Sequence, residues 1–409
     1  MNLANCPNLV KLFFDRAERH GEHPFLWAKV DGTYHPQTWR EVAVQVTELA
    51  RGLKALGLQP GDRVVLVSEN RPKWLVADLA IMAAGGITVP AYTTNTVDDH
   101  RHIVNNSGAV GMIVSTAKLA ENALPAAHAS DELRFAITME PVALQQSLNV
   151  EVLDWQAALN RGQPVHVNII EDAQALRRTD TACIIYTSGT GGVPKGVMQS
   201  HGALLHNLAG AAVVLDKLGL NDEVFLSFLP LSHAYEHTAG QFFPIALGAQ
   251  IYYAEGADKL LSNMAEARPT LMMAVPRLYE MMHGRISRGV EQQGGKKAAL
   301  FHKTLALGTK AFTAPASLTL LEKLQNKALS ALVRKKVAQR FGGRLKAFVS
   351  GGAPLNPDIG LFFTALGVRI LQGYGQTESG PVVCVNVPEK IKMHAVGPIF
   401  PNTEVKIAA

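Results

Sequence analysis

The chain has 409 residues, which is long enough for two or more packed units with sizeable cores. A hydrophobic share of 47% and a charged share of 18% exclude an intrinsically disordered chain. The net charge of +5 comes from basic residues that are not massed on a tail, so it says little about nucleic-acid binding. The three cysteines, Cys6, Cys183 and Cys384, lie far apart and predict neither a disulfide framework nor a zinc site, which fits a reducing cytoplasm.

Targeting and membrane segments are not predicted. The N-terminal residues have no basic stretch followed by an apolar core, so we expect no signal peptide. The most apolar window, Leu75 to Ala91, contains Asp78 and Pro90 and is shorter than the roughly 20 apolar residues of a bilayer span. We interpret it as a buried helix that runs into a strand. The expected location is the cytoplasm, with at most peripheral contact to the inner face of a membrane.

The first half of the chain alternates helices and short apolar strands. From Thr38 to Leu58 the apolar residues recur at helical spacing, and Arg63 to Ser68 reads as a strand buried on both faces, as in parallel sheets. The alternation continues with a helix Trp74 to Ala84, a strand Ile87 to Ala91, a helix Thr96 to Ser107 and a strand Gly111 to Ser115. This order predicts an α/β protein with wound sheets.

The second half has the same character and adds one long helical segment. Residues 296–344 are helical in composition and basic. Such a segment is typical of a solvated helical face, which is the interpretation that we favour, and a basic helix can also lie on an anionic membrane. The expected strands are Ala182 to Tyr186, Glu223 to Phe228, Gln250 to Tyr253, Leu271 to Val275, Leu345 to Val349, Val368 to Gln372 and Thr403 to Ile407.

Three glycine-containing loops each follow an expected strand, and ligands of open α/β sheets bind at such strand ends. The first loop, YTSGTGGVPKG at 186–196, differs from a P-loop because its lysine precedes the last glycine and no Gly-Lys-Ser/Thr leads into a helix. The others are SGGAPL at 350–355 and GYGQTE at 373–378. Glycine lets the backbone approach a ligand, free N–H groups attract anionic oxygens, and Glu378 offers a carboxylate for magnesium.

Together and in this order, the three loops resemble the signature motifs of the adenylate-forming superfamily, which includes acyl-CoA synthetases, adenylation domains and firefly luciferase. The resemblance extends over nearly the whole chain, including residues 61–92 and FLPLSHAYEH at 228–237. It implies a large N-terminal domain with two wound α/β subdomains, at 1–180 and 181–395, and the start of a small β-barrel subdomain at 396–409. The superfamily's C-terminal lid domain, and the aspartate motif before it, are expected to be absent.

The resemblance also implies roles for individual residues. His233 would lie near the substrate carboxylate, Tyr374 would stack on adenine, Thr377 would contact the α-phosphate, and Glu378 would hold Mg²⁺. The catalytic set would be His233, Lys195, Thr377 and Glu378. The β- and γ-phosphates of ATP would be held by Thr187, Ser188, Gly189, Thr190, Gly191, Gly192 and Lys195. The adenine side would be lined by Gly351, Gly352, Ala353 and Pro354, with Gln372, Gly373, Tyr374, Gly375 and Gln376 in the third loop.

The implied reaction is attack of a carboxylate on the α-phosphorus of ATP, release of pyrophosphate, and transfer of the acyl group to coenzyme A. A carboxylate is already ionised near neutral pH, so the first step needs positioning and charge neutralisation rather than a general base. FLPLSHAYE and AVPRLYEMM resemble the long-chain fatty acyl-CoA synthetase branch. The oligomeric state, the exact chain length and the choice between coenzyme A and a carrier protein are left open.

Other interpretations remain at this point. His233, Glu236 and His237 match the H-x-x-E-H pattern of a zinc peptidase, although such a short pattern arises easily by chance. Neither Ser188 nor Ser350 has the G-x-S-x-G context of a hydrolase. His233 could simply satisfy a hydrogen bond at a strand end, and the chain could be a shortened nucleotide-binding protein without efficient turnover. Gly191 stands where the superfamily commonly has Thr or Ser.

Overall fold

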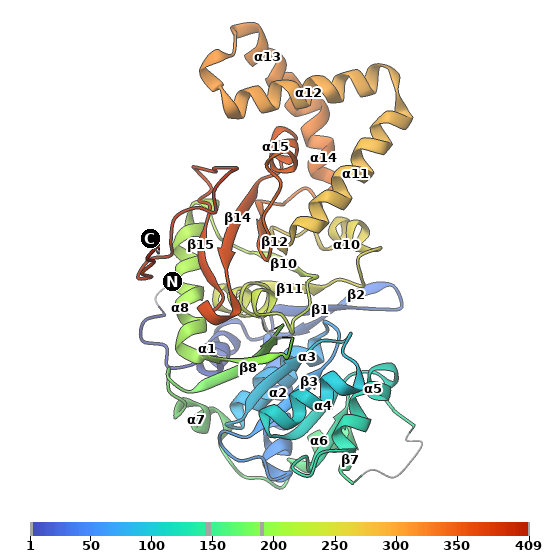
Figure 1. The fold of residues 1–409 in the computed structure, drawn as a ribbon, viewed down its shortest axis with the longest axis vertical. Coiled ribbons are helices and arrows are strands. Elements are labelled where there is room, and N and C mark those ends of the chain that lie inside the picture. The colour runs from blue at the N-terminus through green and yellow to red at the C-terminus, as the bar shows by residue number, and fades with distance from the viewer. Residues whose placement is uncertain (1–2, 144–148, 189–191, 408–409) are drawn as a thin grey trace. The chain divides into compact units, whose positions relative to one another are not determined.

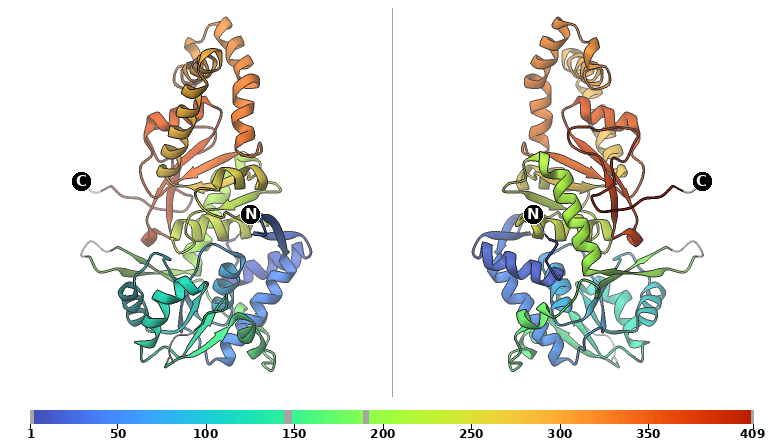
Figure 2. Two further views of the ribbon diagram at one scale, coloured as in Figure 1. Left: turned by 90° about the vertical axis from the view of Figure 1, so that its right-hand side faces the viewer. Right: turned by 90° about the vertical axis from the view of Figure 1, so that its left-hand side faces the viewer.

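The computed structural model of the protein describes residues 3–143, 149–188 and 192–407. These residues form two compact units, and each unit is built from separate stretches of the chain (Figures 1 and 2). Unit 1 contains the residues up to 209, with 229–253 and 377–381. Unit 2 contains 210–228, 254–376 and the residues from 382 onward. The predicted subdomain boundaries after residues 180 and 395 stay predictions.

Unit 1 contains the alternating elements of the first half of the chain. Its elements are α1 (Leu9–His20), β1 (Pro24–Val30), β2 (Thr33–Thr38), α2 (Trp39–Ala55), β3 (Arg63–Val67), α3 (Pro72–Ala83), β4 (Ile87–Ala91), α4 (Val97–Ser107), β5 (Ala109–Val114), α5 (Ala117–His128), β6 (Phe135–Thr138), β7 (Glu151–Asp154), α6 (Trp155–Arg161), α7 (Ile169–Gln174), β8 (Thr181–Thr187), β9 (Lys195–Ser200), the first part of α8 (His201–Leu215), the π-helix η2 (Glu236–Phe242), α9 (Phe243–Leu247), β11 (Gln250–Tyr253) and the short 3₁₀ turn η5 (Thr377–Ser379).

The main sheet of unit 1 has the strand order β7-β6-β5-β3-β4-β8-β9. Its neighbouring strands are parallel except β9, which runs antiparallel to β8. Central β3 is buried on both faces, as its run of Val and Leu predicts. Helix α3 is buried from Trp74 to Ala83 because its sequence is apolar on all sides. The predicted buried helix running into a strand is confirmed. In the same unit, β1 pairs in parallel with β11 and antiparallel with β2.

Unit 2 has a smaller run of strands and a long helical segment. Its strands are ordered β15-β14-β13-β12-β10, parallel from β10 to β14, with β15 antiparallel to β14. Its elements are η1 (Asp216–Leu218), β10 (Val224–Ser227), α10 (Leu260–Ala267), β12 (Leu271–Ala274), α11 (Pro276–Gln293), α12 (Gly295–Thr313), η3 (Pro315–Ser317), α13 (Leu320–Leu329), the π-helix η4 (Ser330–Arg334), α14 (Lys335–Arg340), β13 (Ala347–Ser350), α15 (Pro357–Ala365), β14 (Ile370–Gly375) and β15 (Val382–Val385).

The predicted α/β class is confirmed, and one predicted strand is wrong. Residues 403–407 have no strand conformation, and Ile407 is 85% exposed. Their alternation of polar and apolar residues is a strand pattern, but a strand also needs a partner for its backbone hydrogen bonds. No ladder involving 403–407 exists within the described residues. Within those residues, no helix is long and apolar enough to span a bilayer.

Candidate active site

The predicted phosphate loop connects two antiparallel strands of unit 1. β8 and β9 pair in register up to Thr187 and Lys195, so residues 188–194 form the connection between them. Lys195 is exposed and begins the returning strand. The lysine therefore comes late in the motif because the loop joins two strands, whereas in a P-loop it precedes a helix.

The described end of this loop is fixed by a neighbouring helix. His102 Nε2, from α4, lies 2.9 Å from the carbonyl oxygen of Pro194. Gly192 has a φ of +85°, which favours glycine, and among the described residues no atom lies within 4 Å of the position a Cβ would take there. This end of the loop thus has room beside its backbone for a ligand. The predicted residues Gly189, Thr190 and Gly191 lie outside the described residues.

The predicted α-phosphate and magnesium residues of unit 1 lie beside β9. Gln199 of β9 donates a hydrogen bond from Nε2 to the backbone oxygen of Thr377, over 2.7 Å. Thr377 is half-buried, and the side chain of Glu378 is exposed in the turn η5. The structure therefore brings Thr377 and Glu378 close to the strand that begins with Lys195.

Gln199 is also one end of a chain of buried polar side chains. The thiol of Cys183 donates to Gln199 Oε1 over 3.7 Å, and His237 Nδ1 lies 3.9 Å from the same sulfur. His237 Nε2 lies 2.9 Å from Asp78 Oδ2. Gln241 donates to the same carboxylate oxygen over 2.9 Å. These hydrogen-bonded side chains thus connect α3, through the π-helix and β8, to β9.

The charge on His237 determines which group donates and which accepts in each hydrogen bond of this buried polar network. Burial alone would lower the pKa of His237, but the Asp78 carboxylate and the Cys183 sulfur outweigh burial and raise that pKa to about 10. An imidazolium donates from both ring nitrogens, here toward Asp78 and Cys183. The thiol hydrogen of Cys183 then points to Gln199, whose amide donates to Thr377. Because all four side chains from Asp78 to Gln199 are buried, they can support the Thr377 peptide but cannot attack a substrate.

The segment that carries His233 is held by Asn70. Asn70 Nδ2 donates to the backbone oxygen of Leu229 over 2.7 Å, and Asn70 Oδ1 accepts from the backbone N–H of Leu231 over 3.1 Å. His233 Nδ1 accepts from the backbone N–H of Tyr235, 3.1 Å away, and burial lowers the pKa of His233. A neutral ring that accepts at Nδ1 has its proton on Nε2. His233 can therefore offer one N–H donor to an oxygen of a ligand.

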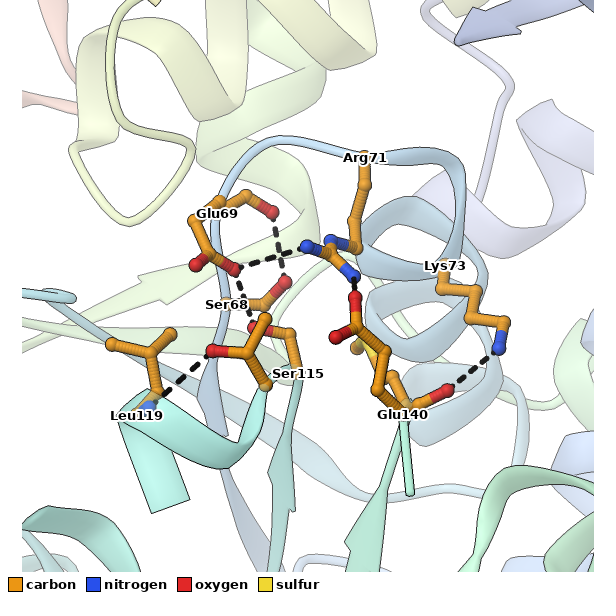
Figure 3. A network of polar contacts seen from close by, with 9 residues as sticks. Ser68, Glu69, Arg71, Lys73, Ser115, Leu119 and Glu140 are labelled. Atoms are coloured by element: carbon orange, nitrogen blue, oxygen red, sulfur yellow. Dashed lines mark hydrogen bonds and ion pairs between the residues drawn. The ribbon is translucent and has the colours of Figure 1, made fainter. Parts of the chain in front are cut away.

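The neighbours of Asn70 in sequence, Glu69 and Arg71, belong to a polar network at the carboxyl ends of β3, β5 and β6 (Figure 3). Ser115, after β5, donates to Glu69 Oε2 over 2.5 Å. The Arg71 guanidinium bridges Glu69, at 3.3 Å, and Glu140, at 2.6 Å. These contacts fix the loop between β3 and α3 on both sides of Asn70. This network is not among the features predicted from the sequence, although the polar run of residues 68–71 directly after an apolar strand is a signal for it.

In unit 2 the other two predicted loops lie at the same edge of the strands. β13 and β14 are parallel, and Ser350 pairs with Gln372. Residues 351–354 therefore leave β13 where residues 373–375 continue β14. Gly352 has a φ of +79°, and a Cβ there would have only the Val275 side chain nearby, at 3.5 Å. At Gly373 a Cβ would lie 2.8 Å from a backbone oxygen of β15, so this strand pair requires glycine.

Tyr374 is available for stacking in unit 2. Its side chain is 49% exposed, although Tyr374 is the last but one residue of strand β14. Gln376 Nε2 donates to the Tyr374 hydroxyl over 2.9 Å, which restrains the ring from its far end. Gln372 Oε1 is buried with no hydrogen-bond partner among the described residues. These features give unit 2 an exposed aromatic face and an unused acceptor beside the glycine loops.

Comparison with known proteins matches this arrangement to one family. The profile of the AMP-binding enzyme family matches residues 13–409. The chain belongs to the AMP-binding enzyme family. Peroxisomal long chain acyl-CoA synthetase 6 of Arabidopsis thaliana is 31% identical over 390 residues, which are 93% of this chain and 53% of that protein. A long-chain-fatty-acid–CoA ligase of Mycobacterium tuberculosis is 29% identical over 412 residues, covering 98% of this chain and 66% of the ligase.

Solved structures of AMP-binding enzymes share the fold. A benzoate CoA ligase from Burkholderia xenovorans has a TM-score of 0.69 and 23% identity, and the match covers 96% of this chain and 66% of that one. This chain therefore spans about half to two thirds of the length of the relatives it matches. The structural likeness confirms the predicted fold of the adenylate-forming N-terminal domain.

The zinc-peptidase interpretation finds no support in the geometry. Glu236 and His237 do lie in a helix, the π-helix η2, but His237 Nε2 is engaged with Asp78, and the Asp78 carboxylate raises the pKa of His237, which favours the charged ring. A zinc ligand must be a neutral imidazole with a free nitrogen. Across residues 3–143, 149–188 and 192–407, no cluster of three His, Cys, Asp or Glu side chains could hold a metal ion.

Proposed function

We propose that this protein activates a fatty acid with ATP, forming an acyl-adenylate and pyrophosphate, and that the acyl group then passes to coenzyme A. The observation that carries the proposal is the set of three glycine-containing loops, each directly after a strand, in a chain of the AMP-binding enzyme family. The names of its relatives, which are long-chain acyl-CoA synthetases and ligases, support the choice of substrate.

In unit 1 the proposed role of the loop and of β9 is to hold the phosphates. Thr187, Ser188, Lys195 and the backbone of Gly192 supply donors and one positive charge, and the open space at Gly192 fits a bound anion. Thr377, held by Gln199, would contact the α-phosphate. The exposed carboxylate of Glu378 fits Mg²⁺, which prefers oxygen ligands and, when bound, neutralises charge on the phosphates.

In unit 2 the proposed role of the two loops is to bind adenine. The glycines at 351–352 let the backbone approach a flat ring closely, and Tyr374 offers its exposed face for stacking. The unused acceptor of Gln372 is chemically suited to a donor such as the amino group of adenine. These roles for Gly351, Gly352, Ala353, Pro354 and residues 372–376 follow from the family resemblance.

His233 is the proposed contact to the carboxylate. Its Nε2 proton can donate to a carboxylate oxygen, which orients the other oxygen for attack on the α-phosphorus. No proton has to leave the nucleophile, because a carboxylate is ionised near neutral pH. The chemical work is then to hold two anions together and to neutralise the charge that develops on the phosphates.

Pyrophosphate release, measured across a series of fatty acids, tests the proposed substrate. We expect long chains to be preferred, because each buried methylene adds about 0.8 kcal/mol of binding in an apolar tunnel. A preference for acetate or an aromatic acid would contradict the long-chain assignment. A Tyr374→Ala variant, which removes the proposed stacking face, should raise the KM for ATP in the same assay.

The transfer to coenzyme A and the cytoplasmic location are further parts of the proposal. Because the chain spans about half to two thirds of its relatives, we propose that these 409 residues alone bind ATP or acyl-adenylate weakly and form little acyl-CoA. Thioester formation by the purified chain, measured alongside pyrophosphate release, decides this. Robust thioester formation would show that the chain is a competent ligase by itself, and nucleotide binding without turnover would favour a nucleotide-binding role.

A further inference from the structure

The long helical segment of unit 2 has a large excess of positive charge. Residues 296–344 contain eleven Lys or Arg residues and a single acidic residue, Glu322, so their net charge is +10 in a chain whose net charge is +5. Glu322 is itself paired with Lys310, at 2.7 Å. The exposed lysines Lys323, Lys327 and Lys335 form no ion pair within the described part of the chain. This segment is therefore a strongly basic surface.

The same segment exposes a row of large apolar side chains. Leu320, Leu321 and Leu324 of α13 are 80%, 65% and 67% exposed, and Leu332 in the following π-helix is 54% exposed. Leu320 and Leu324 are four residues apart and so share one face of the helix. Figures 1 and 2 show α12 and α13 extending beyond the strands of unit 2. Within the part of unit 2 that the structure describes, these leucines are left largely uncovered, although large aliphatic side chains are normally buried.

We propose that α13, η4 and the start of α14, residues 320–336, dock on an anionic lipid bilayer. The leucines would enter the boundary between headgroups and acyl chains, while Lys323, Lys327 and the lysines at 335–336 would contact the negatively charged headgroups. Exposed leucines distinguish this surface from a nucleic-acid site, because phosphate contacts need basic and polar donors but no apolar row. The helix would lie on the membrane surface. The proposal does not depend on which acid the enzyme activates.

Vesicle co-sedimentation of the purified chain tests the proposal without any catalytic step. We expect the chain to sediment with phosphatidylglycerol vesicles, to bind phosphatidylcholine vesicles at least tenfold more weakly, and to be released by high salt. Replacing Leu320, Leu321 and Leu324 together by Ser, or Lys323 and Lys327 together by Gln, should each weaken binding to the anionic vesicles roughly tenfold or more.

Matched substitutions elsewhere serve as controls. Val30→Ser with Val213→Ser removes two side chains that are 56% and 60% exposed, and Lys118→Gln with Lys217→Gln removes two exposed charges. Both control pairs should bind vesicles as the unchanged chain does, with circular dichroism confirming that every variant is folded. Failure of the unchanged chain to bind anionic vesicles would overturn the proposal. So would equal binding to both lipids, or a dimer that the leucine substitutions convert to a monomer, since the surface would then join two copies of the chain.

Discussion

At the residue scale, Gln199 connects the buried polar side chains that begin at Asp78 to the proposed phosphate site. Its amide donates to the Thr377 backbone, and its carbonyl accepts from Cys183. A Gln199→Leu change leaves the buried Cys183 thiol and the half-buried Thr377 carbonyl without their bonds, and an unpaired buried polar group typically costs about 1–3 kcal/mol. We expect lower thermal stability together with a roughly tenfold weaker affinity for ATP, measured by isothermal titration calorimetry.

Gln241 provides the matched control for Gln199. It is also a buried glutamine, and its amide donates over 2.9 Å, but to Asp78 at the other end of the chain. A Gln241→Leu variant should lose stability while its ATP affinity stays within about twofold of the unchanged chain, since the lost bond is remote from Thr377. An equal loss of affinity in both variants would mean that Gln199 has only a structural role.

Gly191 is the position at which the phosphate loop departs from the family pattern. The other donors proposed for the loop are the hydroxyls of Thr187, Ser188 and Thr190 and the charge on Lys195. We therefore predict that a Gly191→Thr change alters the affinity for ATP by less than about fivefold, because one more hydroxyl adds a single hydrogen bond of about 1 kcal/mol at most. A gain of tenfold or more, in the same calorimetric titration, would show that the present loop lacks a needed donor.

At the element scale, Gly308 determines how closely α12 and α15 approach each other. A Cβ at Gly308 would lie 2.6 Å from the backbone oxygen of Ala365 in α15. A Gly308→Ala change should therefore destabilise unit 2 by about 1–3 kcal/mol, because the helices must separate. The shift of the urea unfolding midpoint measures this change.

Gly284 supplies the comparison for Gly308. It lies in helix α11, and no atom lies within 4 Å of its Cβ position. Gly284→Ala should stabilise the protein by about 0.5–1 kcal/mol, because alanine restricts the unfolded chain and meets no clash. If both changes shift the midpoint in the same direction, the close approach of α12 and α15 is not a constraint on packing.

The elements that sequence predicted best have local signals. Strand Ile87–Ala91 matches its prediction in full, and helix α4 begins one residue after predicted Thr96, where Thr96 and Asp99 form a capping box. The strand expected at residues 403–407 failed because its pattern was local but its pairing had to come from elsewhere. The π-helix η2 has no sequence signal that distinguishes it from an α-helix.

The candidate site also has features with a local sequence signal and features that depend on distant residues. Loops with glycine after apolar strands are visible in sequence, so Lys195, Tyr374 and Glu378 could be named in advance, although their roles are still proposals. The supporting contacts could not be named, because their partners lie far apart along the chain. Asp78 and His237 are separated by 159 residues, and Asn70 and Leu229 also by 159. Sequence patterns predict the helix or strand in which a residue lies, but they do not predict which distant side chains contact each other.

At the scale of the whole molecule, the buried pair of His237 and Asp78 predicts how stability varies with pH. His237 has its pKa raised to about 10 in the folded state, against about 6.5 in an unfolded chain. The pair therefore contributes its full stability below about pH 6.5, and that contribution is lost as the pH rises toward about 10. The free energy of unfolding should fall by up to about 1.4 kcal/mol per pH unit between about pH 7 and about pH 8.5.

Denaturant unfolding at several pH values measures this slope, and four other buried or partly buried groups with shifted pKa values act outside this window. Burial lowers the pKa of both His100 and His201 to about 4, so these side chains add pH dependence on the acid side of their ordinary value. Burial raises the pKa of the Cys6 and Cys384 thiols, so these side chains act above the window. A double variant, Asp78→Asn with His237→Gln, removes both charges and should unfold with a free energy that is flat across the window. A flat profile for the unchanged chain would mean that His237 is neutral, in which case its ring cannot donate to Asp78 and Cys183 at once.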